Sequence, residues 1–281
     1  MFEVEGSGRA FRGESMALHI GTCGFSYRDW IGPFYPNGIK SLEMLPYYAE
    51  RFSAVEINST YYAIPAPKLF ESMDKRTPQQ FRFTVKAPGS ITHVPAAETP
   101  AAAEAQAFRE CLQPLIGSGK LAAVLAQFPN SFRPGDEAWE RLGQLRSFWP
   151  DLPLIAEFRH RDWQADATLR GLRELGIGWC NVDEPRFRSL MRPGAEVTSD
   201  IGYIRFHGRN YDRWWKQQRE AHERYDYAYP PQELTEWIPR IAEVSEQTKE
   251  SFVFFNNHRN GKAAVNARQL SEMLDAGDAD R

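Results

Sequence analysis

The chain has 281 residues, of which 42% are hydrophobic and 25% are charged, a composition typical of a globular protein. A net charge of −3 and an isoelectric point of about 6.1 disfavour a protein that binds nucleic acid over its whole surface. No apolar run approaches the roughly 20 residues of a membrane-spanning helix, and three cysteines without metal-type spacing argue against a disulfide framework or a structural zinc and predict a cytoplasmic protein.

The first 16 residues contain three glutamates and no apolar segment, so they do not resemble a secretory signal. We expect residues 1–16 to be a poorly ordered N-terminal lead-in. No linker, low-complexity tract or change of composition interrupts the rest of the chain. The sequence therefore predicts a single domain over residues 17–281.

Short β-rich runs recur along the chain, and each ends at a turn signal. Eight are found, at residues 18–23, 54–59, 82–88, 122–129, 153–159, 178–183, 203–208 and 252–257. Helical patterns, with apolar residues three or four apart, occupy residues 39–52, 103–116, 136–149, 167–176, 231–244 and 265–277. Between the sixth and seventh strands, residues 184–200 show no convincing helix.

The alternation of strands and helices predicts an α/β protein with parallel strands and right-handed crossovers. Eight such units fit a TIM (β/α)₈ barrel with helix six weak or missing. An open doubly wound sheet is the alternative, which the lack of a glycine-rich phosphate loop after the first strand disfavours.

In a barrel, alternate strand residues point inward, and the functional groups of known enzymes lie at the carboxyl ends of the strands. We therefore expect one set of polar residues to converge at that end: Glu56, Asn58, Lys86, Gln127, Glu157, Arg159, Asn181, Asp183, Arg205, His207, Asn256 and Asn257. Any one of them alone fits a structural ion pair as well. Burying so many polar groups is costly, which favours a functional pocket.

Two aromatic-rich loops follow the first and seventh strands, "YRDWIGPFYP" and "NYDRWWKQQRE". They either wall the pocket or pack the rim of the barrel. Trp30 in the first loop, and Tyr61 after the second strand, are candidate substrate-binding aromatics.

Seven segments resemble the motifs of a known family, in the same order along the chain. They are "GTCGFSYRDWIGPFYP", "EINSTYYAIP", "FTVKAPGSITH", "QFP", "EFRHRDW", "RFHGRN" and "FNNHRNGKAAVNA", from Gly21 to Ala267. The chain is thereby similar to the YecE-like family, also called domain of unknown function 72. Cys23 differs from the serine common in the first motif. The resemblance implies a TIM barrel and no established reaction.

The charges of the expected pocket predict a small anionic ligand. Guanidinium groups bind phosphate or carboxylate through paired hydrogen bonds, and a nearby carboxylate can transfer protons. We predict an enzyme, a hydrolase or lyase, that acts on a phosphorylated or carboxylated sugar- or nucleotide-like substrate. The catalytic candidates are Glu157, Glu56, His207 and Lys86; the substrate-binding candidates are Arg159, Arg205, Asn58, Gln127, Asp183, Asn256, Asn257, Tyr61 and Trp30. Replacing Arg205 is expected to weaken anion binding while the fold is kept.

Three alternatives stay open. The first is a metal-dependent phosphodiesterase or repair-type nuclease, which would bind a divalent metal ion through Glu56, Glu157, Asp183 and His207. The sequence contains no compact metal-binding motif, so we expect no cofactor. A non-catalytic module that binds nucleotides or nucleic acid is disfavoured by the acidic isoelectric point. A glycosidase is disfavoured because Glu56 and Glu157 lie on the second and fifth strands, far apart around the ring.

Overall fold

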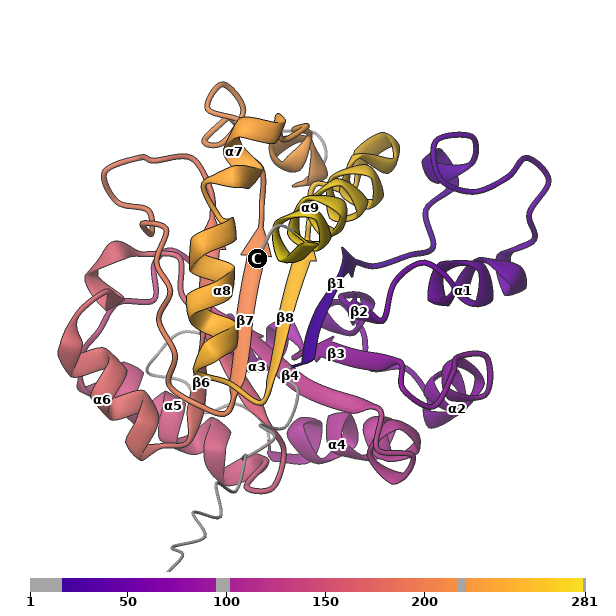
Figure 1. Cartoon of the computed structure of the whole chain (residues 1–281). Coiled ribbons are helices and arrows are strands. Elements are labelled where there is room, and N and C mark those ends of the chain that lie inside the picture. Colours follow the sequence, from indigo (N-terminus) through magenta and orange to yellow (C-terminus); the bar gives the residue numbers. More distant parts are fainter. Residues whose placement is uncertain (1–16, 95–101, 217–220, 280–281) are drawn as a thin grey trace, which may run out of the picture.

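A computed structural model describes residues 17–94, 102–216 and 221–279. Eight parallel strands form one closed barrel in the order of the chain, which confirms the prediction of a TIM barrel (Figure 1). The strands are β1 (Ala17–Cys23), β2 (Ala54–Ile57), β3 (Arg82–Lys86), β4 (Leu121–Gln127), β5 (Leu154–Glu157), β6 (Ile177–Asp183), β7 (Ile201–Phe206) and β8 (Glu250–Phe255). The lead-in predicted at residues 1–16 lies outside the described residues.

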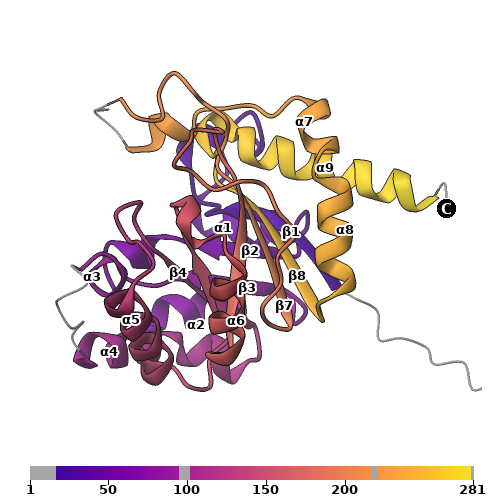
Figure 2. The same cartoon turned by 90° about the vertical axis from the view of Figure 1, so that its left-hand side faces the viewer.

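Helices surround the barrel in both views (Figures 1 and 2). The α-helices are α1 (Ser41–Ala49), α2 (Pro67–Lys75), α3 (Gly89–Thr92), α4 (Ala102–Gly117), α5 (Asp136–Phe148), α6 (Asp166–Glu174), α7 (Pro231–Thr235), α8 (Ile238–Glu246) and α9 (Lys262–Ala279). Short 3₁₀ helices occupy Arg28–Trp30, Ser59–Tyr61, Arg161–Trp163, Ala221–Tyr225 and Arg259–Gly261. Helix α2, which buries Phe70 and Met73 on one face, is not among the helices predicted from the sequence.

No helix forms between β6 and β7, as the sequence predicts for residues 184–200. The segment instead passes along the outside of the barrel as an irregular chain (Figure 1). Asn181 on β6 holds it there: its side-chain amide donates to the Glu196 carbonyl over 2.9 Å, and its Oδ1 accepts from the Glu196 N–H at 3.0 Å. The side chain of Asn181 therefore replaces part of the packing that a helix would supply, and it faces away from the barrel axis.

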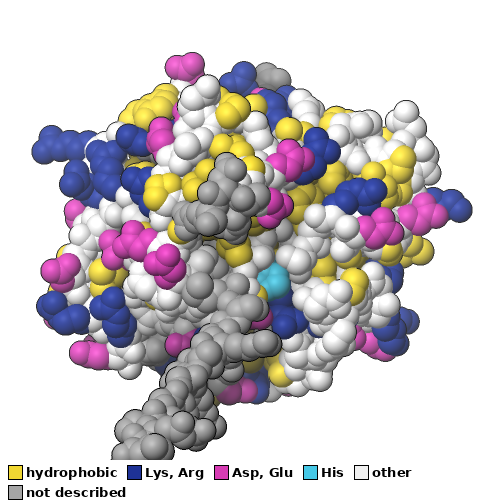
Figure 3. Space-filling view, in the orientation of Figure 1, with side chains coloured by type: hydrophobic (Ala, Val, Ile, Leu, Met, Phe, Trp, Pro, Cys, Tyr) yellow, Lys and Arg dark blue, Asp and Glu magenta, His cyan; other side chains and the backbone are white. Residues whose placement is uncertain are grey.

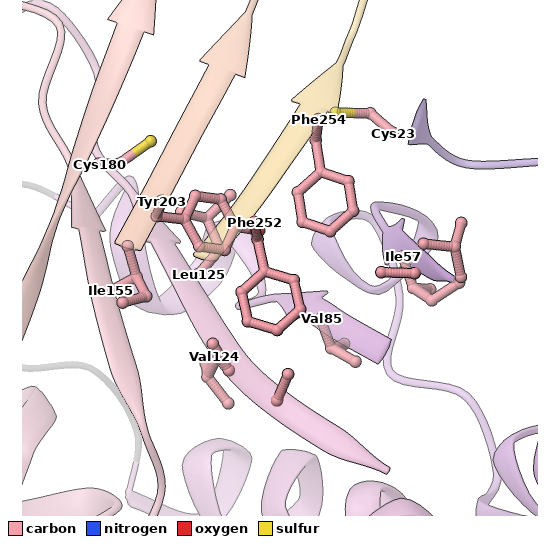
Figure 4. Close-up of a cluster of buried hydrophobic side chains, with 14 of the residues drawn as sticks. Cys23, Ile57, Val85, Val124, Leu125, Ile155, Cys180, Tyr203, Phe252 and Phe254 are labelled. Carbon is pink, nitrogen blue, oxygen red and sulfur yellow. The ribbon is translucent and has the colours of Figure 1, made fainter. Parts of the chain in front are cut away.

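The interior of the barrel is apolar and aromatic below its carboxyl end. Tyr203 and Phe254, from the neighbouring strands β7 and β8, lie among Leu125, Ile155 and the two cysteine side chains Cys23 and Cys180 (Figure 4). All six side chains are buried. Polar groups placed on top of this layer have no water beneath them, so each needs a partner in the protein or in a ligand.

The outer surface carries charges of both signs. On the face shown in Figure 3, Lys and Arg side chains lie among Asp and Glu side chains, apart from a small group of cations at the upper left. This face is therefore not a continuous basic surface of the kind that binds nucleic acid. Within the described part of the chain, no helix combines the length and the apolar character needed to cross a bilayer.

Candidate functional site

A cavity of about 780 Å³ opens at the carboxyl end of the barrel, where the sequence predicts a pocket. Seven of the predicted site residues line it: Asn58, Tyr61, Lys86, Gln127, Arg159, Arg205 and Asn256. They come from β2, β3, β4, β5, β7 and β8 or from the residues just after them, so their convergence is a consequence of the alternating strand pattern.

Three predicted catalytic residues lie behind the lining of the cavity and not at its surface. Glu56, Glu157 and His207 are fully buried and do not belong to its lining. Arg205 separates the two glutamates from the cavity: its Nη2 donates to Glu56 Oε1 at 2.7 Å, and its Nη1 pairs with Glu157 Oε2. A ligand in the cavity therefore meets the guanidinium before it meets either carboxylate.

The bridge through Arg205 also corrects the expectation that Glu56 and Glu157 are far apart. Side chains from opposite strands of a narrow barrel meet at its axis, however distant the strands are around the ring. Glu56 accepts a second hydrogen bond, from the Tyr203 hydroxyl at 2.8 Å, and Glu157 pairs with Arg159 Nε at 2.7 Å. The two carboxylates thus balance buried guanidinium groups, which is a structural task.

The electrostatics of Glu157 and His207 do not favour proton transfer by either residue. Burial acts to raise the pKa of Glu157, but the charges of Arg159 and Arg205 outweigh it and hold the pKa well below its ordinary value. Burial, with the charge of Arg159, lowers the pKa of His207 to about 3, so its imidazole is neutral. His207 Nδ1 lies 3.2 Å from the Asn256 amide, and its Nε2 lies 3.2 Å from Glu157 Oε1. Accepting from Asn256 leaves the Nε2 proton facing the carboxylate.

Lys86 is the one predicted catalytic residue that reaches the cavity surface. Its Nζ donates to Gln127 Oε1 at 2.8 Å and lies 4.2 Å from the centre of the Tyr61 ring. Among the described residues no carboxylate forms an ion pair with it. Burial and then the charge of Arg205 lower the pKa of Lys86 to about 8. The amine therefore exchanges protons close to neutral pH.

Glu184 is a cavity residue that the sequence reasoning missed. It follows β6 directly, in the segment without a helix, and its side chain is buried in the cavity wall. Its carboxylate binds Arg159 Nη1 at 3.1 Å and accepts the Met191 N–H at 3.1 Å. Burial nonetheless raises the pKa of Glu184 to about 7, against the opposing charge of Arg159. A carboxyl group with such a pKa suits acid–base catalysis near neutral pH.

Strand β6 is the strand on which the predicted inward face is wrong. Val182 pairs with Arg205 in the barrel register, and Cys180 pairs with Tyr203, so these two residues face the axis. Asn181 and Asp183 face outward. Every residue of β6 is buried, because the 184–200 segment and the helices cover its outer face. On β6 the outward side chains Asn181 and Asp183 bind the irregular segment and Tyr229, so the polar residues of this strand do not mark its inner face.

Asp183 anchors the C-terminal helices to the outside of the barrel. Its carboxylate accepts bonds from Arg209 Nη2, the Tyr229 hydroxyl and Trp237 Nε1, each at 2.7 Å. We expect Asp183→Asn, which keeps the shape and removes the charge, to lower the free energy of unfolding by about 1 to 3 kcal/mol. Binding of inorganic phosphate, measured by calorimetry, should stay unchanged because the residue is outside the cavity.

The matched control for this variant is Asp200→Asn. Asp200 forms an ion pair with Lys249 at 2.6 Å, but both side chains are more than 70% exposed. Exposed pairs contribute about 1 kcal/mol or less. An equal loss of stability in the two variants, or a loss of phosphate binding in Asp183→Asn, would contradict the structural role of Asp183.

Two more predicted binding residues lie away from the cavity. Trp30 is buried between Tyr27, Phe34 and Tyr35, and its indole N–H donates to the His258 carbonyl. Asn257 is buried one residue beyond Asn256, on the opposite face, where its amide donates to the Tyr227 carbonyl. The prediction that both contact a ligand is wrong in this structure, since each is occupied in packing the loops onto the barrel.

Some residues of the two aromatic loops line the cavity, and others pack the rim of the barrel. Tyr27 from the first loop and the pair Trp214 and Trp215 from the second line the cavity. The cavity is also lined by His93 and His258, two histidines that the sequence places near strand ends, and by residues that sequence reasoning did not assign: Ser59, Tyr62, Pro129, Asn130, Leu190, Arg224 and Tyr225. Most of them lie on loops, where no periodicity indicates which way a side chain points.

The metal site considered as an alternative is not assembled. Asp183 lies outside the barrel, and Arg205 is inserted between Glu56 and Glu157. Within residues 17–94, 102–216 and 221–279, no group of three His, Cys, Asp or Glu side chains is arranged to hold a metal ion. The side chains predicted as ligands therefore do not fit a divalent ion in this arrangement.

Comparison with known proteins identifies relatives over nearly the whole chain. A family model described as "Protein of unknown function DUF72" matches residues 19–280. UPF0759 protein YunF of Bacillus subtilis is 34% identical over 272 residues, covering 92% of this chain and 95% of YunF. UPF0759 protein YecE of Escherichia coli is 30% identical over 194 residues, or 65% of each chain. The crystal structure of a DUF72 family protein from Thermotoga maritima has a TM-score of 0.85 at 41% identity, covering 92% of this chain and 99% of that one.

Proposed function

The chain belongs to the DUF72 family, whose name specifies no activity, and from the geometry of its barrel mouth we propose that it is an enzyme for an anionic, sugar-like or nucleotide-like substrate. The substrate would occupy the cavity at the carboxyl end of the barrel, and catalysis would proceed by proton transfer between the substrate and side chains of the cavity wall.

One observation carries the proposal: the cavity surface presents cations, while most of the compensating carboxylates lie behind them. Among the described residues, Lys86, Arg159, Arg205 and Arg224 line the cavity, against the carboxylate of Glu184 alone. The Nε atoms of Arg205 and Arg224 are buried and have no hydrogen-bond partner among the described residues. Unpartnered guanidinium N–H groups in a cavity are suited to a phosphate or carboxylate oxygen.

The proton-transfer roles belong to Lys86 and Glu184 in this proposal. Their pKa values of about 8 and about 7 lie close to neutral pH, so each changes its protonation state under ordinary conditions. Glu56 and Glu157 hold Arg205 in place, and His207 contacts Glu157, which makes the three of them positioning residues. Lys86 and Glu184 together supply an acid and a base for the reaction, and this assignment does not require a bound metal ion.

The uncharged side chains that line the cavity suit a polyhydroxylated or planar substrate. Asn58 Oδ1 is buried in the cavity lining without a hydrogen-bond partner among the described residues, and it can accept from a hydroxyl or amino group. Tyr61, Trp214 and Tyr225 give the same cavity flat apolar faces. The three cysteines are free and buried, which agrees with the cytoplasmic location that we expect.

The test compares ribose 5-phosphate, inorganic phosphate and ribose by isothermal titration calorimetry. We expect the two phosphates to bind and the uncharged sugar to bind far more weakly. Arg224→Gln should weaken phosphate binding about tenfold or more, because a charged hydrogen bond contributes about 1.5 to 3 kcal/mol.

Arg170→Gln is the matched control, since Arg170 is an exposed residue of α6 in the outer ring of helices. It removes the same charge from the protein and should leave binding unchanged. Equal affinity for ribose and ribose 5-phosphate, or no binding of either phosphate compound, would overturn the proposed function.

A further inference from the structure

The groups that surround the Lys86 amine are those expected around an amine nucleophile and not around a simple counter-ion. Its Nζ is held by two neutral groups, the Gln127 carbonyl oxygen at 2.8 Å and the face of the Tyr61 ring at 4.2 Å. A lysine whose only task is to balance charge would be expected to contact a carboxylate. The carboxylates of this region are instead occupied by Arg159 and Arg205.

The charged and titratable groups around Lys86 come from several elements. Arg205 on β7 and Arg159 after β5 disfavour its protonation, while Glu157 on β5 and Glu56 on β2 favour it; burial and the two arginines prevail. His93, at the end of α3, makes an edge-to-face contact with Tyr61, with ring centres 5.0 Å apart. Its pKa is lowered to about 4, by burial and then by Lys86, so the imidazole is neutral.

We propose that Lys86 forms an imine with the aldehyde or ketone carbon of an anionic substrate. The inference rests on the proposed function, because Arg159, Arg205 and Arg224 must hold the anionic group of the same molecule in the cavity. It goes further by naming the reacting group of the substrate, and it favours a lyase over a hydrolase.

The step balances without an oxidant or a metal ion. The neutral Nζ adds to the carbonyl carbon, a C–N bond forms, and the π electrons of the C=O bond move to oxygen, which takes up a proton. The nitrogen then loses a proton, the protonated hydroxyl leaves as water, and the nitrogen lone pair closes the C=N bond. Glu184 in the cavity wall can give and receive these protons, because its pKa of about 7 lies near ambient pH.

Reductive trapping tests the inference directly. The protein is incubated with glycolaldehyde phosphate and sodium cyanoborohydride near neutral pH, so that any imine is reduced to a stable secondary amine. Peptide mapping by mass spectrometry then locates the label. We expect Lys86 to be labelled more than any other lysine by at least about tenfold. At about pH 7.5, roughly a quarter of an amine with a pKa of about 8 is neutral, against about one in a thousand for an ordinary lysine.

Two variants and one probe act as controls. Lys86→Arg keeps the charge and cannot form an imine, so labelling of the cavity should be lost; Lys68→Arg, at an exposed position of α2, should leave labelling unchanged. Uncharged glycolaldehyde should label Lys86 at least about tenfold more slowly, since it lacks the group that the arginines bind.

The outcomes separate this inference from the proposed function. If glycolaldehyde phosphate competes with inorganic phosphate for the cavity but leaves Lys86 unlabelled, the imine is overturned and the anion site stands. If neither compound binds, both proposals fall. The peptide map of the labelled wild-type protein decides the question even if Lys86→Arg does not fold. Labelling spread evenly over surface lysines also overturns the inference.

Discussion

Arg205→Ala is expected to lower the free energy of unfolding by about 3 to 5 kcal/mol, the largest effect among the substitutions considered. The guanidinium group is 1% exposed and balances two carboxylates that are fully buried. Removing it takes away the cation that pairs with Glu56, whose carboxylate keeps the uncharged Tyr203 hydroxyl, while Glu157 keeps Arg159. Urea-induced unfolding of the variant and the wild type measures the difference. The expectation from the sequence, that the fold is kept and only anion binding suffers, is thereby revised.

A double variant distinguishes lost charge balance from lost packing. Arg205→Met with Glu56→Gln fills the space and removes the carboxylate that Arg205 leaves unbalanced, so we expect it to recover at least about half of the lost stability. Arg170→Ala, on the exposed side of α6, should change stability by about 0.5 kcal/mol or less. A loss below about 1 kcal/mol in Arg205→Ala would show that the buried pairs contribute little.

The Glu184→Gln variant should become more stable than the wild type as the pH rises from about 4.5 to 8. The folded protein holds a proton on Glu184 up to a pKa of about 7, whereas the unfolded chain releases it near the ordinary value of about 4.3. The wild type therefore loses stability between these two pH values, by roughly 3 kcal/mol, and the glutamine variant does not have this loss. Unfolding free energies at several pH values give the difference.

At about pH 4.5 the variant and the wild type should be nearly equal in stability, because a protonated carboxyl group and an amide are similar in shape and polarity. Glu243→Gln, at an exposed position of α8, should show no such divergence with pH. A difference between Glu184→Gln and the wild type that stays constant within about 0.5 kcal/mol across the range would contradict the raised pKa. It would also remove Glu184 from the proposed acid–base pair.

The alternating pattern of the strands predicted most of the cavity floor correctly. Lys86, Gln127, Arg205 and Asn256 line the cavity because each lies at an inward position at or just beyond the carboxyl end of its strand. The rule worked for these strands since the helices outside them require apolar contacts, so the polar side chains are left to face the axis. It failed for β6, where the outward residues Asn181 and Asp183 are polar because they bind groups outside the barrel, and so misplaced both.

The amino-acid sequence was enough to predict the order and number of the strands, the absent helix after β6 and the face on which most polar residues lie. These features depend on local periodicity and on turns, which a single chain displays directly. Which inward residues reach the cavity follows, in contrast, from packing in three dimensions. Arg205 reaches it while Glu56, Glu157 and His207 stay behind its lining, because strand stagger and the size of side chains from opposite strands set how far each side chain extends. The same packing fixes the position of Glu184, since an irregular segment places its side chains by long-range contacts such as those with Arg159 and Met191.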